Sequence, residues 1–107
     1  MSDEIRTLPP EVGRVVIALC GDYDRRERVL LRGEAAPAVL SSYETLNRGI
    51  DRALAEVCEE GIRTQLRRDI AEKRGARRTQ ILTISEGTYK RRKRESALRI
   101  ARELNLL

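Results

Sequence analysis

SSYETLNRGIDRALAEV, residues 41–57, carries apolar side chains at the spacing of one helical face. The members of this stripe are Tyr43, Leu46, Ile50, Ala53, Leu54 and Val57. Such a period is typical of an amphipathic α-helix that packs on a core. Ser41 and Glu44 have the spacing of a capping box, which predicts that the helix begins at Ser41. Gly61 is expected to end this helix or to mark a bend in it.

Working toward the N-terminus, a second apolar stripe follows the adjacent prolines Pro9 and Pro10, and proline suits a first helical turn. The stripe consists of Val12, Val16, Leu19, Tyr23 and Leu30. A kink or break is expected near Gly21 and Asp22, because glycine costs a helix about 1 kcal/mol relative to alanine. Gly33 is expected to end the helix in a left-handed conformation. Residues 33–41 are then a connector around Pro37 that packs down on the protein.

Working toward the C-terminus, Ile62, Leu66 and Ile70 predict a third, shorter helix that Gly75 ends. Thr79 can cap a very short helix that carries Ile81 and Leu82. Ser85 is a good N-cap for a last helix over residues 86–104, and Asn105 a left-handed C-cap. The apolar face of this last helix contains Tyr89, Ala97, Ile100, Ala101 and Leu104, together with Lys93. The sequence therefore predicts an all-α fold, a small bundle of four to five helices with a C-terminal unit that resembles a helix-turn-helix.

Composition limits what this chain of 107 residues can build. It has no Phe, no Trp and only three Tyr, so we expect one compact domain with an aliphatic core. Such a small core, with Leu98, Leu106 and Leu107 outside it, favours a homo-oligomer. Cys20 and Cys58 are expected to be buried free thiols. The acidic N-terminus and the absence of a long apolar run predict a cytoplasmic protein that does not enter a membrane.

The charges are divided between two parts of the chain. Residues 1–60 hold 8 Lys+Arg and 12 Asp+Glu, a net −4, whereas residues 61–107 hold 14 and 5, a net +9. We therefore expect residues 1–60 to be a helical scaffold that also carries oligomerisation, and residues 61–107 to bind an anion. The five consecutive cations at 90–94 follow the predicted helix start directly, which is typical of a surface that lies on duplex DNA. The predicted DNA-binding residues are Arg77, Arg78, Thr88, Lys90, Arg91, Arg92 and Arg94.

Within that set the expected roles differ. Arg91 and Thr88 are expected to face away from the apolar stripe. Arg91 can read a guanine and Thr88 can contact either a base edge or a phosphate, while the remaining cations contact phosphates. The alternative is a non-enzymatic interaction or assembly module whose basic helix binds an acidic protein. RNA binding is disfavoured because aromatic stacking platforms are nearly absent. An enzyme, a cofactor and a metal site are not expected either, because the chain lacks histidine and a glycine-rich phosphate loop.

Three segments of the chain resemble a group of small phage-encoded regulators. They are residues 43–54 (YETLNRGIDRAL), 84–95 (ISEGTYKRRKRE) and 100–106 (IARELNL). The chain looks like the ArpU/RinA-like late transcription regulators, whose C-terminal part is similar to sigma-factor region 4. The resemblance covers the last third well and the middle loosely. It implies a transcriptional or DNA-packaging role on a prophage, with RNA polymerase as a further partner.

Overall fold

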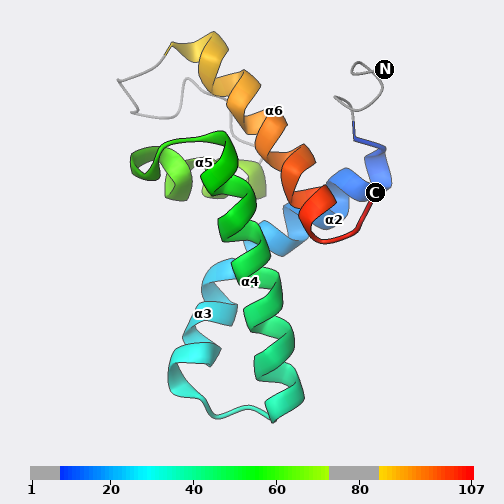
Figure 1. Cartoon of the computed structure of the whole chain (residues 1–107), viewed down its shortest axis with the longest axis vertical. Helices are drawn as coiled ribbons and strands as arrows, with labels where there is room; N and C mark the ends of the chain where they lie inside the picture. The colour runs from blue at the N-terminus through cyan, green and yellow to red at the C-terminus, as the bar shows by residue number, and fades with distance from the viewer. Residues whose placement is uncertain (1–7, 73–84) are drawn as a thin grey trace.

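The computed structural model describes residues 8–72 and 85–107, and within these ranges the protein consists of five α-helices and no strand. The helices are α2 (Pro10–Gly21), α3 (Tyr23–Arg32), α4 (Pro37–Val57), α5 (Glu60–Glu72) and α6 (Glu86–Glu103). The predicted all-α class and helix number are thus confirmed for the described residues. Figure 1 shows α4 as the central helix, with α6 beside its second half and α3 beside its first half.

Several predicted helix ends are confirmed. The chain breaks at Asp22, between α2 and α3, and Gly33 ends α3 with a φ of 64°. Ser85 caps α6 by accepting a hydrogen bond from the Thr88 amide. Beyond α6, Asn105 has a φ of 59°, and the Leu106 amide donates back to the Ala101 carbonyl at 2.8 Å. That bond is the longer one of a Schellman motif.

Other predicted ends are wrong. α4 begins at Pro37 rather than at Ser41, because proline at the first helical position has its φ already set and needs no amide partner. Ser41 and Glu44 are therefore ordinary exposed positions inside the helix. The connector shrinks accordingly to residues 33–36, and Val39, expected to pack down, is 37% exposed. α4 also ends before Gly61, at Cys58, whose backbone is extended.

One hydrophobic core joins the two halves of the chain, because α2 packs on α5 and α4 packs on α6. Its buried members come from α2, the second half of α4 with its C-cap residue Cys58, α5 and α6. They are Val16, Cys20, Ile50, Ala53, Leu54, Cys58, Ile62, Leu66, Ile70, Tyr89, Ile100 and Ala101. Both cysteines are free and buried, as predicted, and burial raises the pKa of Cys20 to about 12.

Polar side chains make the buried contacts between α3 and α4. Arg26 is 2% exposed and donates to Asn47 Oδ1 at 2.7 Å and to the Leu19 carbonyl, which ties α2, α3 and α4 together. The Asn47 amide in turn donates to Glu27 Oε2 at 2.8 Å. A buried guanidinium is tolerated only with such partners, so this network positions α3. None of the helices in the described ranges is long and apolar enough to cross a membrane.

Candidate nucleic-acid interface

The first turn of α6 begins at the Ser85 cap and leaves its backbone accessible. The Ser85 hydroxyl donates to Thr88 Oγ1 at 2.9 Å, so the half-buried Thr88 side chain is partly used in the cap itself. A side chain placed on exposed Gly87 would meet nothing within 4 Å. Amide groups at a helix N-terminus carry partial positive charge, which favours an anion. The start of α6 therefore offers bare backbone next to the basic run.

Three residues of the basic run point into solvent. Lys90, Arg91 and Arg94 are all exposed on α6. Arg91 and Arg94 have no ion-pair partner among the residues that the structure describes, and Lys90 lies 3.5 Å from the exposed Glu86 carboxylate. Exposed pairs of this kind contribute little, about 0–1 kcal/mol. All three cations are thus available to an external anion.

Arg92 differs from its neighbours because its guanidinium turns toward α4. It donates to the Val57 carbonyl at 2.7 Å and lies 3.2 Å from the Glu59 carboxylate. The Val57 carbonyl belongs to the last turn of α4, where carbonyls lack helical partners. Arg92 therefore closes the end of α4, which is a structural role that its place in a run of five cations did not reveal.

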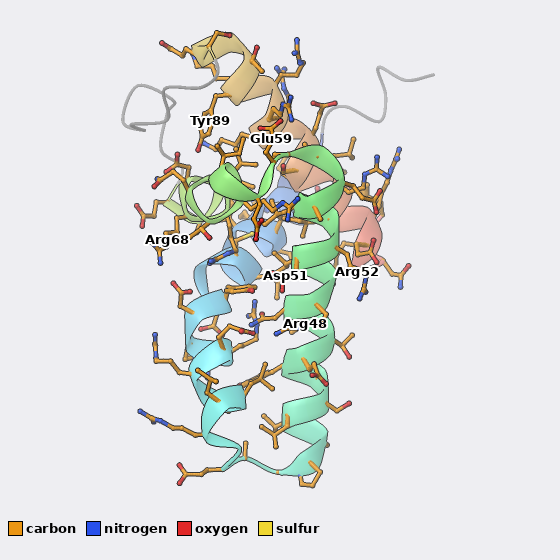
Figure 2. All side chains as sticks on the ribbon, turned by 60° about the vertical axis from the view of Figure 1, so that its left-hand side comes forward. Arg48, Asp51, Arg52, Glu59, Arg68 and Tyr89 are labelled. Atoms are coloured by element: carbon orange, nitrogen blue, oxygen red, sulfur yellow. The ribbon has the colours of Figure 1, made fainter. Side chains whose placement is uncertain are left out.

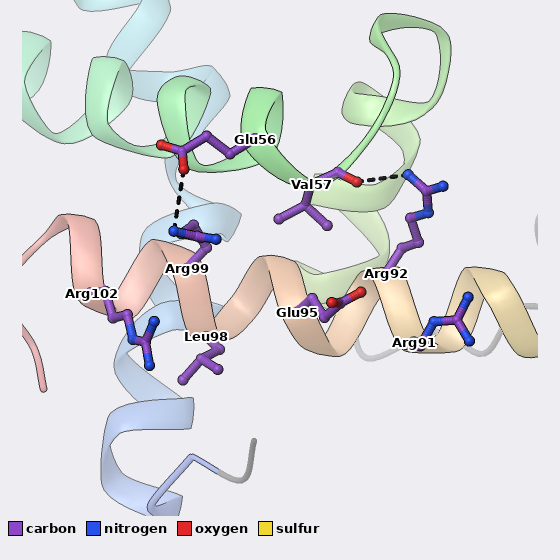
Figure 3. A pocket seen from close by; sticks show the side chains of 8 residues that line it. All are labelled: Glu56, Val57, Arg91, Arg92, Glu95, Leu98, Arg99 and Arg102. Atoms are coloured by element: carbon purple, nitrogen blue, oxygen red, sulfur yellow. Dashed lines mark hydrogen bonds and ion pairs between the residues drawn. The ribbon is translucent and has the colours of Figure 1, made fainter. Parts of the chain in front are cut away.

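A groove of about 420 Å³ runs between α4 and α6, as Figure 3 shows. Its lining contains four arginines and two glutamates: Glu56, Val57, Arg91, Arg92, Glu95, Leu98, Arg99 and Arg102. Arg99 pairs across the groove with Glu56 at 3.2 Å. The sequence prediction missed Arg99 and Arg102. Their signal is helical spacing, because Arg91, Glu95, Leu98 and Arg102 follow one another at steps of four, three and four residues, and Arg99 lies four residues after Glu95.

On another side of α6, an apolar cavity of about 340 Å³ lies against α2 and α5. Val16, Ile17 and Ile70 contribute to its lining, and Lys90, Lys93 and Arg94 line the α6 side. Lys93 is half-buried, as its place on the apolar face predicted. Burial lowers its pKa, and the nearby Asp69 carboxylate opposes that shift. The charge of Lys93 is therefore destabilised by partial burial and stabilised in part by the buried Asp69 carboxylate.

Tyr89 fixes the first turns of α6 onto α5. Its hydroxyl donates to Asp69 Oδ2, and Gln65 donates to the other oxygen of this carboxylate at 2.9 Å. Asp69 is 1% exposed and Tyr89 is 3% exposed, so the contact is shielded from water. In Figure 2, Tyr89 lies between the two helices. This contact sets the rotation of α6 and so decides which cations face outward.

Arg77, Arg78 and the predicted short helix with Ile81 and Leu82 lie outside the described residues. The first helix of the predicted helix-turn-helix is thus not among α2–α6. Nor do three or more His, Cys, Asp or Glu side chains gather as metal ligands within residues 8–72 and 85–107. Comparison of the chain with family models, with curated proteins and with solved structures found no match.

Proposed function

We propose that this protein binds duplex DNA through the outer face of the first turns of α6. The main support for this proposal is that Lys90, Arg91 and Arg94 are exposed. They lie beside the capped start of α6, where Gly87 is also exposed. DNA-binding helices enter the major groove with their N-terminal turns, and an arginine there can donate two hydrogen bonds to one guanine. The net +9 of residues 61–107 adds long-range attraction to phosphate. The resemblance to phage late regulators makes transcription regulation the proposed role.

Roles within α6 follow from where each side chain lies. Arg91 is the candidate for base contact, and Lys90 and Arg94 are candidates for phosphate contact. Arg92 is withdrawn from this surface by its bonds to α4. Thr88 is left with a secondary role, because its hydroxyl already bonds to Ser85.

The test compares two pairs of arginine substitutions that remove the same charge. Arg91→Gln with Arg94→Gln removes two exposed cations from α6, and Arg14→Gln with Arg68→Gln removes two exposed cations from α2 and α5. Affinity for a random duplex is measured by fluorescence anisotropy at several salt concentrations. We expect only the α6 pair to weaken binding and to flatten the salt slope, by roughly 0.9 for each phosphate that the protein no longer neutralises. Equal losses of affinity from both pairs would reduce the effect to net charge and reject the α6 surface.

The groove between α4 and α6 favours one alternative, an acidic protein segment or RNA polymerase as the ligand. Leu98 and Val57 supply apolar surface there, and Arg91 and Arg102 supply cations without an ion-pair partner in the described part of the chain. DNA makes little use of a leucine, whereas an amphipathic acidic helix needs one. Leu98→Gln therefore separates the two ligands: it should leave duplex affinity unchanged and abolish binding of an acidic helical peptide.

A further inference from the structure

The apolar stripe of α4 continues past the end of the helix that covers it. Three contacts join the antiparallel helices α4 and α6. Arg92 donates to the Val57 carbonyl, and Arg99 forms an ion pair with Glu56. Nearer the C-terminal end of α6, Arg52 donates to the Glu103 carboxylate. Leu104 then lies against Gly49. α6 thus ends at the level of Gly49. The apolar stripe of α4 continues beyond this level, toward the start of the helix. Leu46 lies four residues before Ile50, and Val39 lies seven residues before Leu46.

Beyond this level the chain forms a two-helix arm, defined here as residues 28–46: the end of α3, the connector and the first half of α4. Figure 1 shows the arm projecting from the rest of the molecule. It holds seven large apolar side chains, none of them buried: Val29, Leu30, Leu31, Val39, Leu40, Tyr43 and Leu46. Leu31 is 87% exposed and Val39 is 37% exposed.

Five of these seven side chains are partly covered, whereas Leu31 and Val39 remain exposed. The buried contacts between α3 and α4 are those of Arg26 and Asn47, at the base of the arm. Two helices alone cannot enclose an apolar interior, whereas four can, with each helix covering its neighbours. Large apolar side chains that stay uncovered on a small projecting element indicate a surface available to a partner.

The charges on the arm indicate what covers it. Arg28, Arg32, Glu34 and Glu44 are exposed and have no ion-pair partner within residues 8–72 and 85–107. Two cations and two anions on one small surface suit neither a uniformly acidic nor a uniformly basic partner. They suit a copy of the same surface turned by a two-fold axis, because each cation of one arm can then meet an anion of the other.

We infer that the arm is a homodimerisation surface, in which the arms of two copies pack together as a four-helix bundle. Dimer formation by the arm does not depend on DNA binding by α6, because no residue of the arm belongs to the proposed DNA surface.

The first experiment is sedimentation equilibrium from about 1 µM to about 200 µM protomer, which spans the range of weak dimers. The wild type should shift from the 12.2 kDa chain mass toward twice that value. Val39→Lys should weaken dimerisation at least about tenfold, as buried interface positions do. Val15→Lys is the matched control, because Val15 is a helical valine with 41% exposure outside the arm. It should leave the dimer intact.

Leu31→Lys provides an independent variant that cannot disturb the core, since Leu31 is the most exposed of the large apolar side chains that the structure describes. It should also weaken the dimer. A wild type that stays at the chain mass throughout the range would overturn the inference and would leave the arm to a different protein. So would a dimer that Val15→Lys dissociates and Val39→Lys does not.

A second experiment tests whether the occupant is a copy of the arm itself. One variant carries Arg28→Glu and Arg32→Glu, and the other carries Glu34→Lys and Glu44→Lys. Each alone should remain monomeric by repulsion between like charges, and a mixture of the two should form a heterodimer. A mixture that stays monomeric while each variant is folded by circular dichroism would contradict pairing of arm with arm.

Discussion

Gly49 on α4 packs directly against Leu104, the residue that ends α6: a Cβ on Gly49 would lie 2.6 Å from Leu104 Cδ2. Gly49 is buried, so a side chain at this position would have to displace the Leu104 side chain. We expect Gly49→Val to lower the free energy of unfolding by about 1–3 kcal/mol, the usual cost of overpacking. Gly13→Val is the control, because a Cβ on Gly13 meets nothing within 4 Å. Urea denaturation of both variants, at one protomer concentration, should show destabilisation at Gly49 alone.

Leu54 lies in the middle of the α4 stripe and is 2% exposed. Leu54→Ala should lower the free energy of unfolding by about 2–5 kcal/mol, because a cavity replaces buried methyl groups. Leu107→Ala, at a position 57% exposed, should change it by less than about 0.5 kcal/mol. Similar values for the two variants, measured by chemical denaturation, would mean that the core has been placed wrongly.

Substitution of Arg92 should mainly lower stability, whereas substitution of Arg91 should mainly lower DNA affinity. Arg92→Gln removes the bond to the Val57 carbonyl and the Glu59 ion pair, so we expect it to cost about 1–2 kcal/mol of stability. Arg91→Gln should cost less than about 0.5 kcal/mol but weaken duplex binding more than Arg92→Gln does. Thermal denaturation of the two single variants compares their stabilities, and fluorescence anisotropy compares their affinities for duplex DNA. An Arg91 variant that is the less stable of the two would refute the division of roles.

Lys93 should make stability rise with pH in the alkaline range. Burial lowers its pKa in the folded protein below the ordinary 10.5, so between the two pKa values the unfolded chain binds more protons. Stability therefore increases as pH rises through that window, and the cost of the buried charge is present in full below it. Lys93→Met should stabilise the protein at neutral pH, by an amount that shrinks as the pH approaches 10.5.

The control for Lys93 is the same substitution at Lys90, which is exposed on the same helix. Lys90→Met should leave the free energy of unfolding nearly unchanged at neutral pH, because the Lys90 side chain is exposed. If Lys93→Met and Lys90→Met change the free energy of unfolding by the same amount, the partial burial of Lys93 has no energetic consequence and the Lys93 prediction fails.

Helix positions were predictable where one residue decides a local conformation. Gly33 and Asn105 adopt left-handed backbone, and Ser85 caps α6, because each effect depends on atoms within about four residues. The start of α4 was predicted wrongly because two local signals competed, and Pro37 acts four residues ahead of Ser41. The end of α4 at Cys58 had no comparable local signal, since the chain turns there to place α5 on α2.

The candidate site was predictable only as a set of charges. The run at 90–94 is visible in the sequence, but the exposure of Arg91 and Arg94 and the withdrawal of Arg92 depend on how α6 is rotated. That rotation is set by the hydrogen bond from the Tyr89 hydroxyl to the Asp69 carboxylate, and these two residues are 20 positions apart in the sequence. Arg99 and Arg102 join the groove for the same reason, because α4 supplies its other wall.

By itself, the sequence determined that the chain is helical and which side of each helix is apolar, because propensity and period depend on near neighbours. Only the tertiary structure decided how much of each apolar side is covered. The α4 stripe is continuous in sequence, yet Ile50 is buried and Leu46 is not, because α6 reaches Gly49 and ends. Coverage depends on where one helix ends along another, which is a relation between residues far apart in the chain.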